Sequence, residues 1–416
     1  MIRYTKSIIF IISIYMILLS GCSVTPNTKT KLANLSALGK NEPVIVTTEP
    51  ISILTRGDFA KIPVPDLTNL KNYGWDLRSY DLKSYNLINH SEELQYVIFD
   101  TKTSWPKDLP SSFDPTRIME LGRDPGLNIR SLHNRGITGR GVNIAIIDQP
   151  LLLEHEEYKD NIMLYERLNC LSTNAAMHGT SVVSIAVGKN IGVAPDAKVY
   201  YIASTFGKMV GNEFVEDLTL MADGINRVLE INKHLPESEK IKVISISKGF
   251  DYDVKGSAEV YNAIERAKQA GVFVITTSTS KNFNFNLMGL GRNQTANPND
   301  INSYRPGLFW EDVFNSGKFT LDNLLLVPMD ARTCAFNTGK NDYVFSSNGG
   351  LSWTCPWLAG LYALCVQVNP HLTPDEFINI AFETGDEVII YHESRQYSLK
   401  TLINPEKLIR AIEQYL

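Results

Sequence analysis

From residue 139 onward, short continuous apolar runs alternate with longer stretches of helical periodicity. The apolar runs have the length of buried β-strands and lie at 141–148, 198–203, 243–247, 272–277 and 324–327. The helical patterns between them lie at 182–187, 214–232 and 258–270. Because strands that alternate with helices form βαβ units, this order predicts an α/β fold with a doubly wound, mostly parallel sheet.

A different pattern follows residue 349, where two glycines, a leucine and a serine lead into an apolar run. The run has no polar face, so it predicts a helix that is buried on all sides and that begins at Ser352. Unpaired backbone N–H groups and the positive end of the helix dipole meet at such a helix start. A serine there serves either as a helix cap or as a nucleophile whose attack creates an oxyanion.

Three polar residues stand where a parallel sheet gathers its functional groups, at strand ends and helix starts. Asp148 ends the first apolar run, His178 precedes the helical pattern at 182–187, and Ser352 opens the buried helix. Acyl transfer requires a hydroxyl beside an imidazole, and a carboxylate that orients the imidazole. Each residue alone has a structural interpretation, as a cap or a core histidine. Their joint occurrence beside glycines favours a catalytic site.

These residues and their surroundings resemble the subtilisin-like serine peptidases, the subtilases. The resemblance rests on five ordered segments, 141–148, 178–180, 192–197, 247–249 and 350–360. It implies a subtilisin-like peptidase domain over 108–416 and a catalytic triad in the order Asp148, His178, Ser352. It also implies hydrolysis of peptide or protein substrates through an acyl-enzyme. Structural calcium is implied by the resemblance alone, since no metal-ligand spacing or cofactor motif occurs in the sequence.

Two departures from the family pattern affect the catalytic groups. Asp148 is followed by Gln149 and Pro150, where subtilases usually have a hydroxyl residue and a glycine, so the turn beyond the carboxylate is reshaped. At the place of the oxyanion-binding asparagine stands Ser280, with Asn282 as the alternative donor. An atypical oxyanion hole predicts slower turnover. The alternative is a weak or inactive pseudopeptidase that acts as a peptide-binding or regulatory module.

Further departures concern the substrate and the surroundings of the serine. Ser247, Lys248 and Gly249 resemble the family strand that pairs with the substrate backbone. Lys248 replaces a common apolar residue, so it either favours an acidic substrate side chain or is a solvated lysine. Trp353 and Trp357 either fill the core or narrow the entrance to the site.

The first 22 residues have the arrangement of an export signal. Two basic residues precede the apolar stretch 8–19, which is too short to span a bilayer. The end of this segment, Leu19-Ser20-Gly21-Cys22, resembles the lipobox of bacterial lipoproteins. It implies lipid attachment at Cys22 and a location at the cell membrane, on the extracytoplasmic face.

The region 23–107 has no assigned role. Residues 23–50 are polar, as expected of a tether, and leucine then recurs with a period of five at Leu77, Leu82 and Leu87. The region is a removable pro-segment, a docking surface or structural padding. A strand is predicted at 94–99, and a large loop region at 281–322, where glycine and proline are frequent.

Composition and cysteine content narrow the remaining function classes. The 416 residues are 44% hydrophobic and carry a formal net charge of -5 without a long basic run, which argues against nucleic-acid binding. Beside Cys22 the chain has four cysteines, enough for two disulfides, although Cys355 and Cys365 fall in the apolar run and are expected to be buried thiols.

Overall fold

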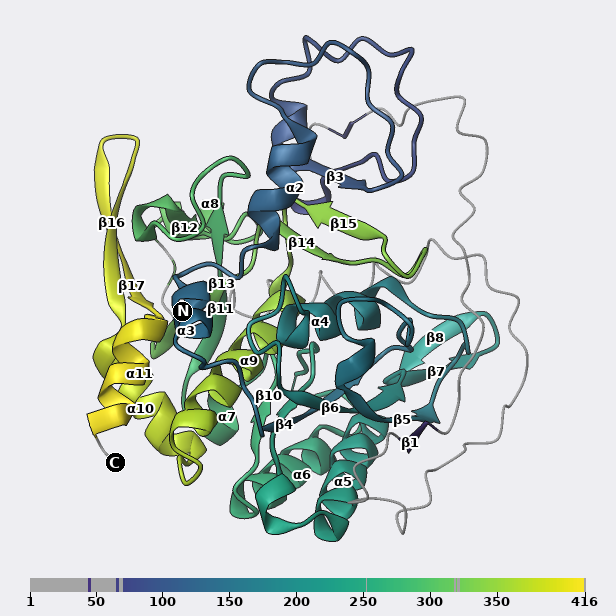
Figure 1. Ribbon diagram of the computed structural model, residues 1–416, viewed down its shortest axis with the longest axis vertical. Coiled ribbons are helices and arrows are strands. Elements are labelled where there is room, and N and C mark those ends of the chain that lie inside the picture. The colour runs from purple at the N-terminus through teal and green to yellow at the C-terminus, as the bar shows by residue number, and fades with distance from the viewer. Residues whose placement is uncertain are drawn as a thin grey trace.

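The computed structural model describes residues 44–45, 65–66, 70–251, 253–317, 319 and 322–414. The predicted export signal, the lipid attachment at Cys22 and nearly all of the predicted tether lie outside these residues. The described part of the chain forms three sheets of four to six strands and a separate two-stranded hairpin (Figure 1).

A six-stranded parallel sheet forms the centre of the molecule, in the order β1-β5-β6-β4-β9-β10. Its strands are β1 (Val44–Ile45), β4 (Asn143–Asp148), β5 (Ile162–Asn169), β6 (Lys198–Ser204), β9 (Ile241–Ser245) and β10 (Phe273–Ile275). All six residues of β4 are buried, which explains why its sequence is apolar from Ile144 up to the aspartate. The predicted α/β fold is confirmed.

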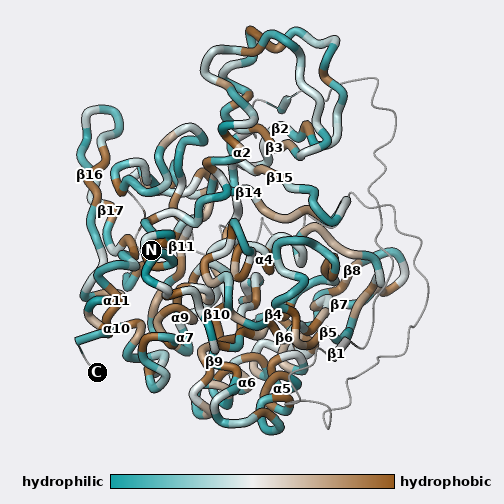
Figure 2. Tube along the Cα trace, viewed as in Figure 1, coloured by the Kyte–Doolittle hydropathy of each residue, from teal (hydrophilic) through white to brown (hydrophobic). Residues whose placement is uncertain are grey.

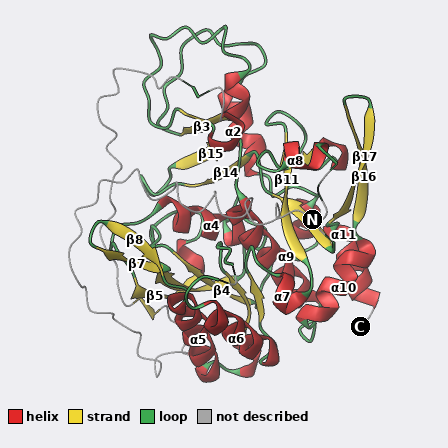
Figure 3. Cartoon of the chain, turned by 180° about the vertical axis from the view of Figure 1, so that it is seen from behind, coloured by secondary structure: helices red, strands yellow, loops and turns green. Residues whose placement is uncertain are grey.

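Two pairs of helices cover the faces of this sheet. On one face lie α5 (Thr219–His234) and α6 (Ser257–Gln269), and on the other lie α4 (Met177–Val187) and α9 (Thr354–Val368) (Figures 1 and 3). Apolar residues concentrate in the central sheet and its covering helices (Figure 2). Within the described chain, the segment Leu351–Val368 is apolar and long enough to cross a membrane, but 78% of it is buried in the protein. It is therefore the core helix that the sequence predicts.

A second sheet, in the order β12-β11-β13-β17-β16, corrects the prediction of a large loop region at 281–322. Its strands are β11 (Asn286–Arg292), β12 (Tyr304–Pro306), β13 (Leu324–Pro328), β16 (Asp386–His392) and β17 (Arg395–Leu402). Strand β11 was not predicted because glycines interrupt its apolar pattern. Gly289 is required there because a Cβ at this position would lie 2.1 Å from the Met329 sulfur. The short helices α7 (Ser280–Phe283) and α8 (Glu311–Asn315) flank these strands.

The N-terminal region joins the rest of the chain through a third sheet, in the order β14-β15-β3-β2. Strands β2 (Trp75–Asp76) and β3 (Val97–Asp100) belong to the N-terminal region, while β14 (Arg332–Ala335) and β15 (Tyr343–Ser346) come from the predicted peptidase domain. The predicted strand at 94–99 begins later, because the 3₁₀ turn Glu93–Tyr96 precedes it. Leu77, Leu82 and Leu87 are all buried in one hydrophobic cluster beneath this sheet. The period of five thus marks inward-facing leucines.

The remaining helices and one hairpin lie at the periphery. Helices α1 (Leu70–Tyr73), α2 (Pro115–Arg123) and α3 (Ile129–Asn134) precede strand β4 along the chain, and α10 (Pro374–Thr384) and α11 (Pro405–Gln414) end the described chain. The predicted helix at 214–232 starts only at Thr219, because residues before it form the hairpin β7 (Gly207–Val210) and β8 (Glu213–Glu216). Exposed residues alternate with half-buried or buried ones along both strands of this hairpin, as expected of a two-stranded ribbon that lies on the protein surface.

Candidate active site

The side chains of Asp148 and His178 meet at the C-terminal edge of the central sheet. Asp148 is the last residue of β4, and His178 lies in the first turn of α4. The His178 Nδ1 and Asp148 Oδ1 atoms are 2.7 Å apart, and the side chains are only 13% and 4% exposed. Burial lowers the pKa of His178, but the charge and hydrogen bond of Asp148 outweigh burial, so the pKa is raised above 6.5.

The Gln149-Pro150 turn fixes the carboxylate rather than disrupting it. The backbone N–H of Gln149 donates to Asp148 Oδ1 over 2.7 Å, so this oxygen accepts two hydrogen bonds. The Gln149 carbonyl in turn accepts from the hydroxyl of Tyr201 on β6, and the Pro150 carbonyl accepts from the Ala176 N–H just before α4. A Cβ on Gly179 would lie 2.1 Å from the Gln149 carbonyl oxygen, which explains the glycine beside the histidine.

Ser352 lies in a 3₁₀ turn, Leu351–Trp353, immediately before α9, which itself begins at Thr354. Its Oγ donates to the Ser247 carbonyl over 3.3 Å, and the Ser247 hydroxyl donates to the Ser352 carbonyl over 2.7 Å. The turn packs against α4, and the ring of Trp353 lies 5.7 Å from the ring of His178. The turn that carries Ser352 therefore reaches the Asp148–His178 pair through Trp353, while the Ser352 hydroxyl is hydrogen-bonded to the Ser247 carbonyl just after β9.

The two predicted oxyanion donors lie in the short helix α7. Ser280 is its exposed first residue. Asn282 is buried, and its amide group donates to Glu265 over 2.6 Å and to the Tyr261 carbonyl over 3.4 Å. Both hydrogens of the Asn282 side-chain amide are thereby committed to α6. This commitment favours Ser280 as the donor, and both assignments remain predictions.

Lys248 has a partner that the sequence does not indicate. Its Nζ lies 2.6 Å from Glu216 Oε1 at the end of β8, and the two side chains are 20% and 27% exposed. It is thus neither a solvated lysine nor a free charge for an acidic substrate group. On either side of it, Ser247 contacts Ser352, and Gly249 lies against Thr277, whose Oγ1 would be 2.5 Å from an added Cβ.

The two tryptophans after the serine are core residues. Trp353 is 2% exposed and Trp357 is fully buried, with its Nε1–H donating to the Pro125 carbonyl over 2.8 Å. Core filling therefore explains Trp357. Trp353 fills the core and also supplies one wall against the His178 ring.

A buried carboxylate that sequence analysis missed supports the segment carrying the serine. Asp330 follows β13, and its two oxygens accept from the Gly349 and Leu308 N–H groups, each over 2.8 Å. Burial raises the pKa of Asp330 to about 7, although these two hydrogen bonds oppose the rise. An aspartate after an apolar strand is the only sequence signal for it, and Asp148 shows the same pattern.

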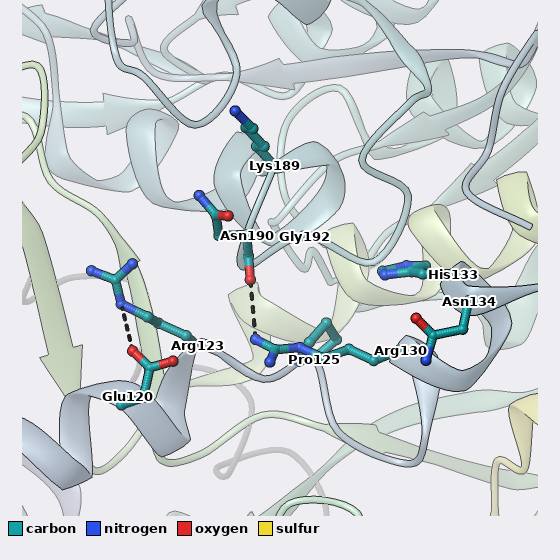
Figure 4. Close-up of a pocket in the computed structure, with 9 residues that line it drawn as sticks. All are labelled: Glu120, Arg123, Pro125, Arg130, His133, Asn134, Lys189, Asn190 and Gly192. Atoms are coloured by element: carbon teal, nitrogen blue, oxygen red, sulfur yellow. Dashed lines mark hydrogen bonds and ion pairs between the residues drawn. The ribbon is translucent and has the colours of Figure 1, made fainter. Parts of the chain in front are cut away.

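A polar pocket of about 380 Å³ lies elsewhere, between α2, α3 and the turn after α4 (Figure 4). It contains none of the predicted site residues. Its two arginines already have partners: Arg123 pairs with Glu120 at 3.5 Å, and Arg130 pairs with Asp124 at 3.5 Å and donates to the Asn190 carbonyl. Lys189 also lines the pocket.

The described residues contain no group of three or more His, Cys, Asp or Glu side chains that could hold a metal ion. Cys170, Cys334, Cys355 and Cys365 are free thiols, and the last two are fully buried in α9 as predicted.

Comparison with known proteins identifies the family of this arrangement. The family model described as "Subtilase family" matches residues 139–395, more than half of the chain. "Subtilisin-like protease 3" of Pseudogymnoascus destructans is 26% identical over 338 residues, which cover 77% of this chain and 76% of that protein. "Serine protease AprX" of Bacillus subtilis is 24% identical over 277 residues, which cover 58% of this chain and 60% of that protein. The solved structure of "Prenylagaramide maturation protease PagA" is similar with a TM-score of 0.49 and 16% identity, over 68% of this chain and 98% of that chain.

Proposed function

Because this chain belongs to the subtilase family of serine peptidases, we propose that Asp148, His178 and Ser352 are its catalytic triad and that it is an endopeptidase anchored to the membrane by lipid. The observation that carries the proposal is the 2.7 Å contact between His178 Nδ1 and Asp148 at the sheet edge against which the Ser352 turn packs.

The proposed reaction proceeds through an acyl-enzyme. Ser352 Oγ attacks the scissile carbonyl carbon while His178 Nε2 takes its proton, and His178 then returns that proton to the leaving amine. Water, deprotonated by His178, then attacks the ester carbonyl; the bond from this carbon to Ser352 Oγ breaks, His178 returns the proton to Oγ, and the new carboxylic acid leaves. Asp148 keeps the proton on Nδ1 and stabilises the imidazolium. Since the Ser352 hydroxyl donates to the Ser247 carbonyl, its hydrogen must leave that carbonyl before it is transferred to His178.

The oxyanion hole in this proposal consists of the Ser352 backbone N–H and the Ser280 hydroxyl. Ser280 is exposed at the start of α7, so its substitution leaves the core intact. We expect Ser280→Asn to raise kcat, by at most the 10²–10³-fold that one such donor contributes, and Ser280→Ala to lower it. An unchanged kcat in both variants excludes Ser280 from the oxyanion hole.

The alternative, a pseudopeptidase that grips peptides without turnover, rests on the altered oxyanion position. Labelling with a fluorophosphonate probe separates the two functions, because the probe reacts only with an activated serine. The proposal expects labelling of the purified chain and none of Ser352→Ala. Ser238→Ala, at an exposed serine in the turn Glu237–Glu239, is the matched control and must label normally. Folded chain that resists the probe contradicts the peptidase function.

Membrane attachment through Cys22 is a separate part of the proposal. Its support is the lipobox-like segment Leu19-Ser20-Gly21-Cys22. Mass spectrometry of the mature protein from a bacterial host tests it. We expect an N-terminus at a diacylglycerol-modified Cys22 and loss of membrane association in Cys22→Ser. A mature N-terminus at another residue, or Cys22→Ser protein that fractionates with the membrane like the parent, contradicts the anchor.

A further inference from the structure

The hairpin β7–β8 contacts the segment Ser247–Lys248, which also contacts the predicted nucleophile Ser352. Ser247 exchanges hydrogen bonds with Ser352 at 2.7 and 3.3 Å. The next residue, Lys248, has its Nζ 2.6 Å from Glu216 at the end of β8. The ion pair therefore lies one residue along the chain from the contact with Ser352, and its two side chains are 20% and 27% exposed.

The face of the hairpin that meets Lys248 is otherwise apolar. Glu216 is opposite Gly207, and Phe214 is opposite Met209, so these four residues share one face of the ribbon. Phe214 and Met209 are half-buried, whereas Val215, on the other face, is 40% exposed. A Cβ on Gly207 would lie 2.3 Å from the Phe214 ring, which shows how closely the ring lies on this strand.

Resting on the proposed peptidase function, we propose that Glu216 is a specificity-determining residue. By pairing with Lys248, it makes the subsite between β8 and the segment after β9 electrically neutral. This subsite therefore takes an uncharged, apolar substrate side chain. The positive charge of Lys248 would otherwise attract a carboxylate on the substrate. Paired with Glu216 at 2.6 Å, the lysine presents no net charge to a passing side chain. The hairpin contributes Phe214 and Met209 as the apolar lining.

The test measures which substrate charge each variant prefers, and the substitutions are at partly exposed side chains. Three series of peptides are compared, in which a single Glu, Gln or Lys is moved one position at a time through the residues before the scissile bond. Each series is assayed by kcat/KM, and in parallel by the rate at which the matching peptidyl phosphonates inactivate Ser352. The variants are Glu216→Gln, Lys248→Gln and the double variant. Glu213→Gln, on the exposed face of the same strand, is the matched control.

We expect Glu216→Gln to raise the Glu-to-Gln ratio about twofold to fivefold at one position, the effect of a partly exposed ion pair. Lys248→Gln should raise the Lys-to-Gln ratio at that same position by a similar factor. The double variant and Glu213→Gln should retain the parent's ratios. If both single variants inactivate normally but keep the parent's ratios at every position, the hairpin does not line the cleft and the inference is wrong. If the parent fails to react with any phosphonate, the proposed function fails and the inference with it.

Discussion

At Asp148, one carboxylate oxygen accepts hydrogen bonds from both His178 and the Gln149 backbone, each over 2.7 Å. The departure from the family pattern at Gln149-Pro150 therefore belongs to the support of the site, since Tyr201 and Ala176 hold this turn in place. A carboxylate oriented by two donors fixes the imidazole next to it in one tautomer. The altered turn at Gln149-Pro150 is therefore compatible with an active peptidase.

The raised pKa of His178 predicts the acid limb of the activity profile. His178 acts as a base only when neutral, so kcat/KM should rise with pH through a midpoint above 6.5. Asp148→Asn removes the charge that raises this pKa. We expect the midpoint to move to lower pH and the plateau to fall by about 10⁴-fold, the loss caused by the wrong tautomer. A profile whose midpoint stays in place in Asp148→Asn would show that Asp148 does not control His178.

Asp330 predicts a pH-dependent stability. Its pKa rises from an ordinary value of 3.8 to about 7 on folding, so the folded state binds the proton more tightly than the unfolded state does. Its contribution to the free energy of unfolding must then decrease as pH rises from about 4 to about 7. Asp330→Asn lacks this titration. Urea unfolding of both proteins across this range should show the difference between them shrinking or changing sign with pH, and a constant difference contradicts the raised pKa.

Sequence reasoning reached the predicted triad but not Asp330 or Glu216, and the physical reason is separation along the chain. Asp148, His178 and Ser352 each have a local context, a strand end or a helix start beside glycine. The partners of Asp330 are backbone N–H groups, which no residue type reveals. Glu216 is recognisable only once the hairpin places it on Lys248.

At the scale of elements, the close packing of α4 against α9 brings His178 and the Ser352 turn together. Gly360 permits it, because a Cβ there would lie 2.7 Å from the Cβ of Val193 and 3.1 Å from the Ala186 carbonyl. The strands β4, β6, β9 and β13 and the helices α6 and α9 were predictable from apolar patterning. Strand β11 was not predictable because glycines interrupt its apolar pattern. The hairpin β7–β8 was not predictable because the helical pattern of α5 was extended into β8.

Gly360→Ala tests this packing. The added methyl group must push α9 away from α4, and overpacking of this kind costs about 1–3 kcal/mol. We expect a lower unfolding midpoint and slower fluorophosphonate labelling of the folded variant, since His178 and Ser352 move apart. Ala359→Gly, a change of the same size at the neighbouring position, is the control for altered helix propensity. Labelling at the parent's rate in Gly360→Ala would show that the contact does not set the site geometry.

At the scale of the whole molecule, residues 75–113 belong to the fold of the peptidase domain. Strand β3 pairs with β15 in antiparallel register, and Phe99 packs against Phe345 with ring centroids 5.3 Å apart. No local sequence pattern indicates this pairing, because the two strands are far apart along the chain. The leucines of this segment are buried in one cluster with Ala331 and Phe345 of the peptidase domain, which favours a structural role. Removal of 23–107 as a pro-segment stays a prediction.

Phe99→Ala therefore predicts a loss of stability in the whole domain. Phe99 is 2% exposed, and removing a buried phenyl ring costs about 3–5 kcal/mol. Urea unfolding followed by tryptophan fluorescence and by probe labelling should show both signals shifting together to lower urea. Tyr391→Ala, at a side chain that is 72% exposed on β16, should leave the midpoint unchanged. Labelling that persists while the fluorescence transition shifts would show that the N-terminal part unfolds independently.

The central claim is that Ser352 forms an acyl-enzyme with help from His178 and Asp148. Active-site titration with an activated ester tests it most directly, because acylation releases a burst of the leaving group before turnover becomes steady. We predict a burst stoichiometric with the folded chain, absent in Ser352→Ala and slowed in Asp148→Asn. Linear release without a burst, at the same rate in the parent and in Ser352→Ala, would contradict it.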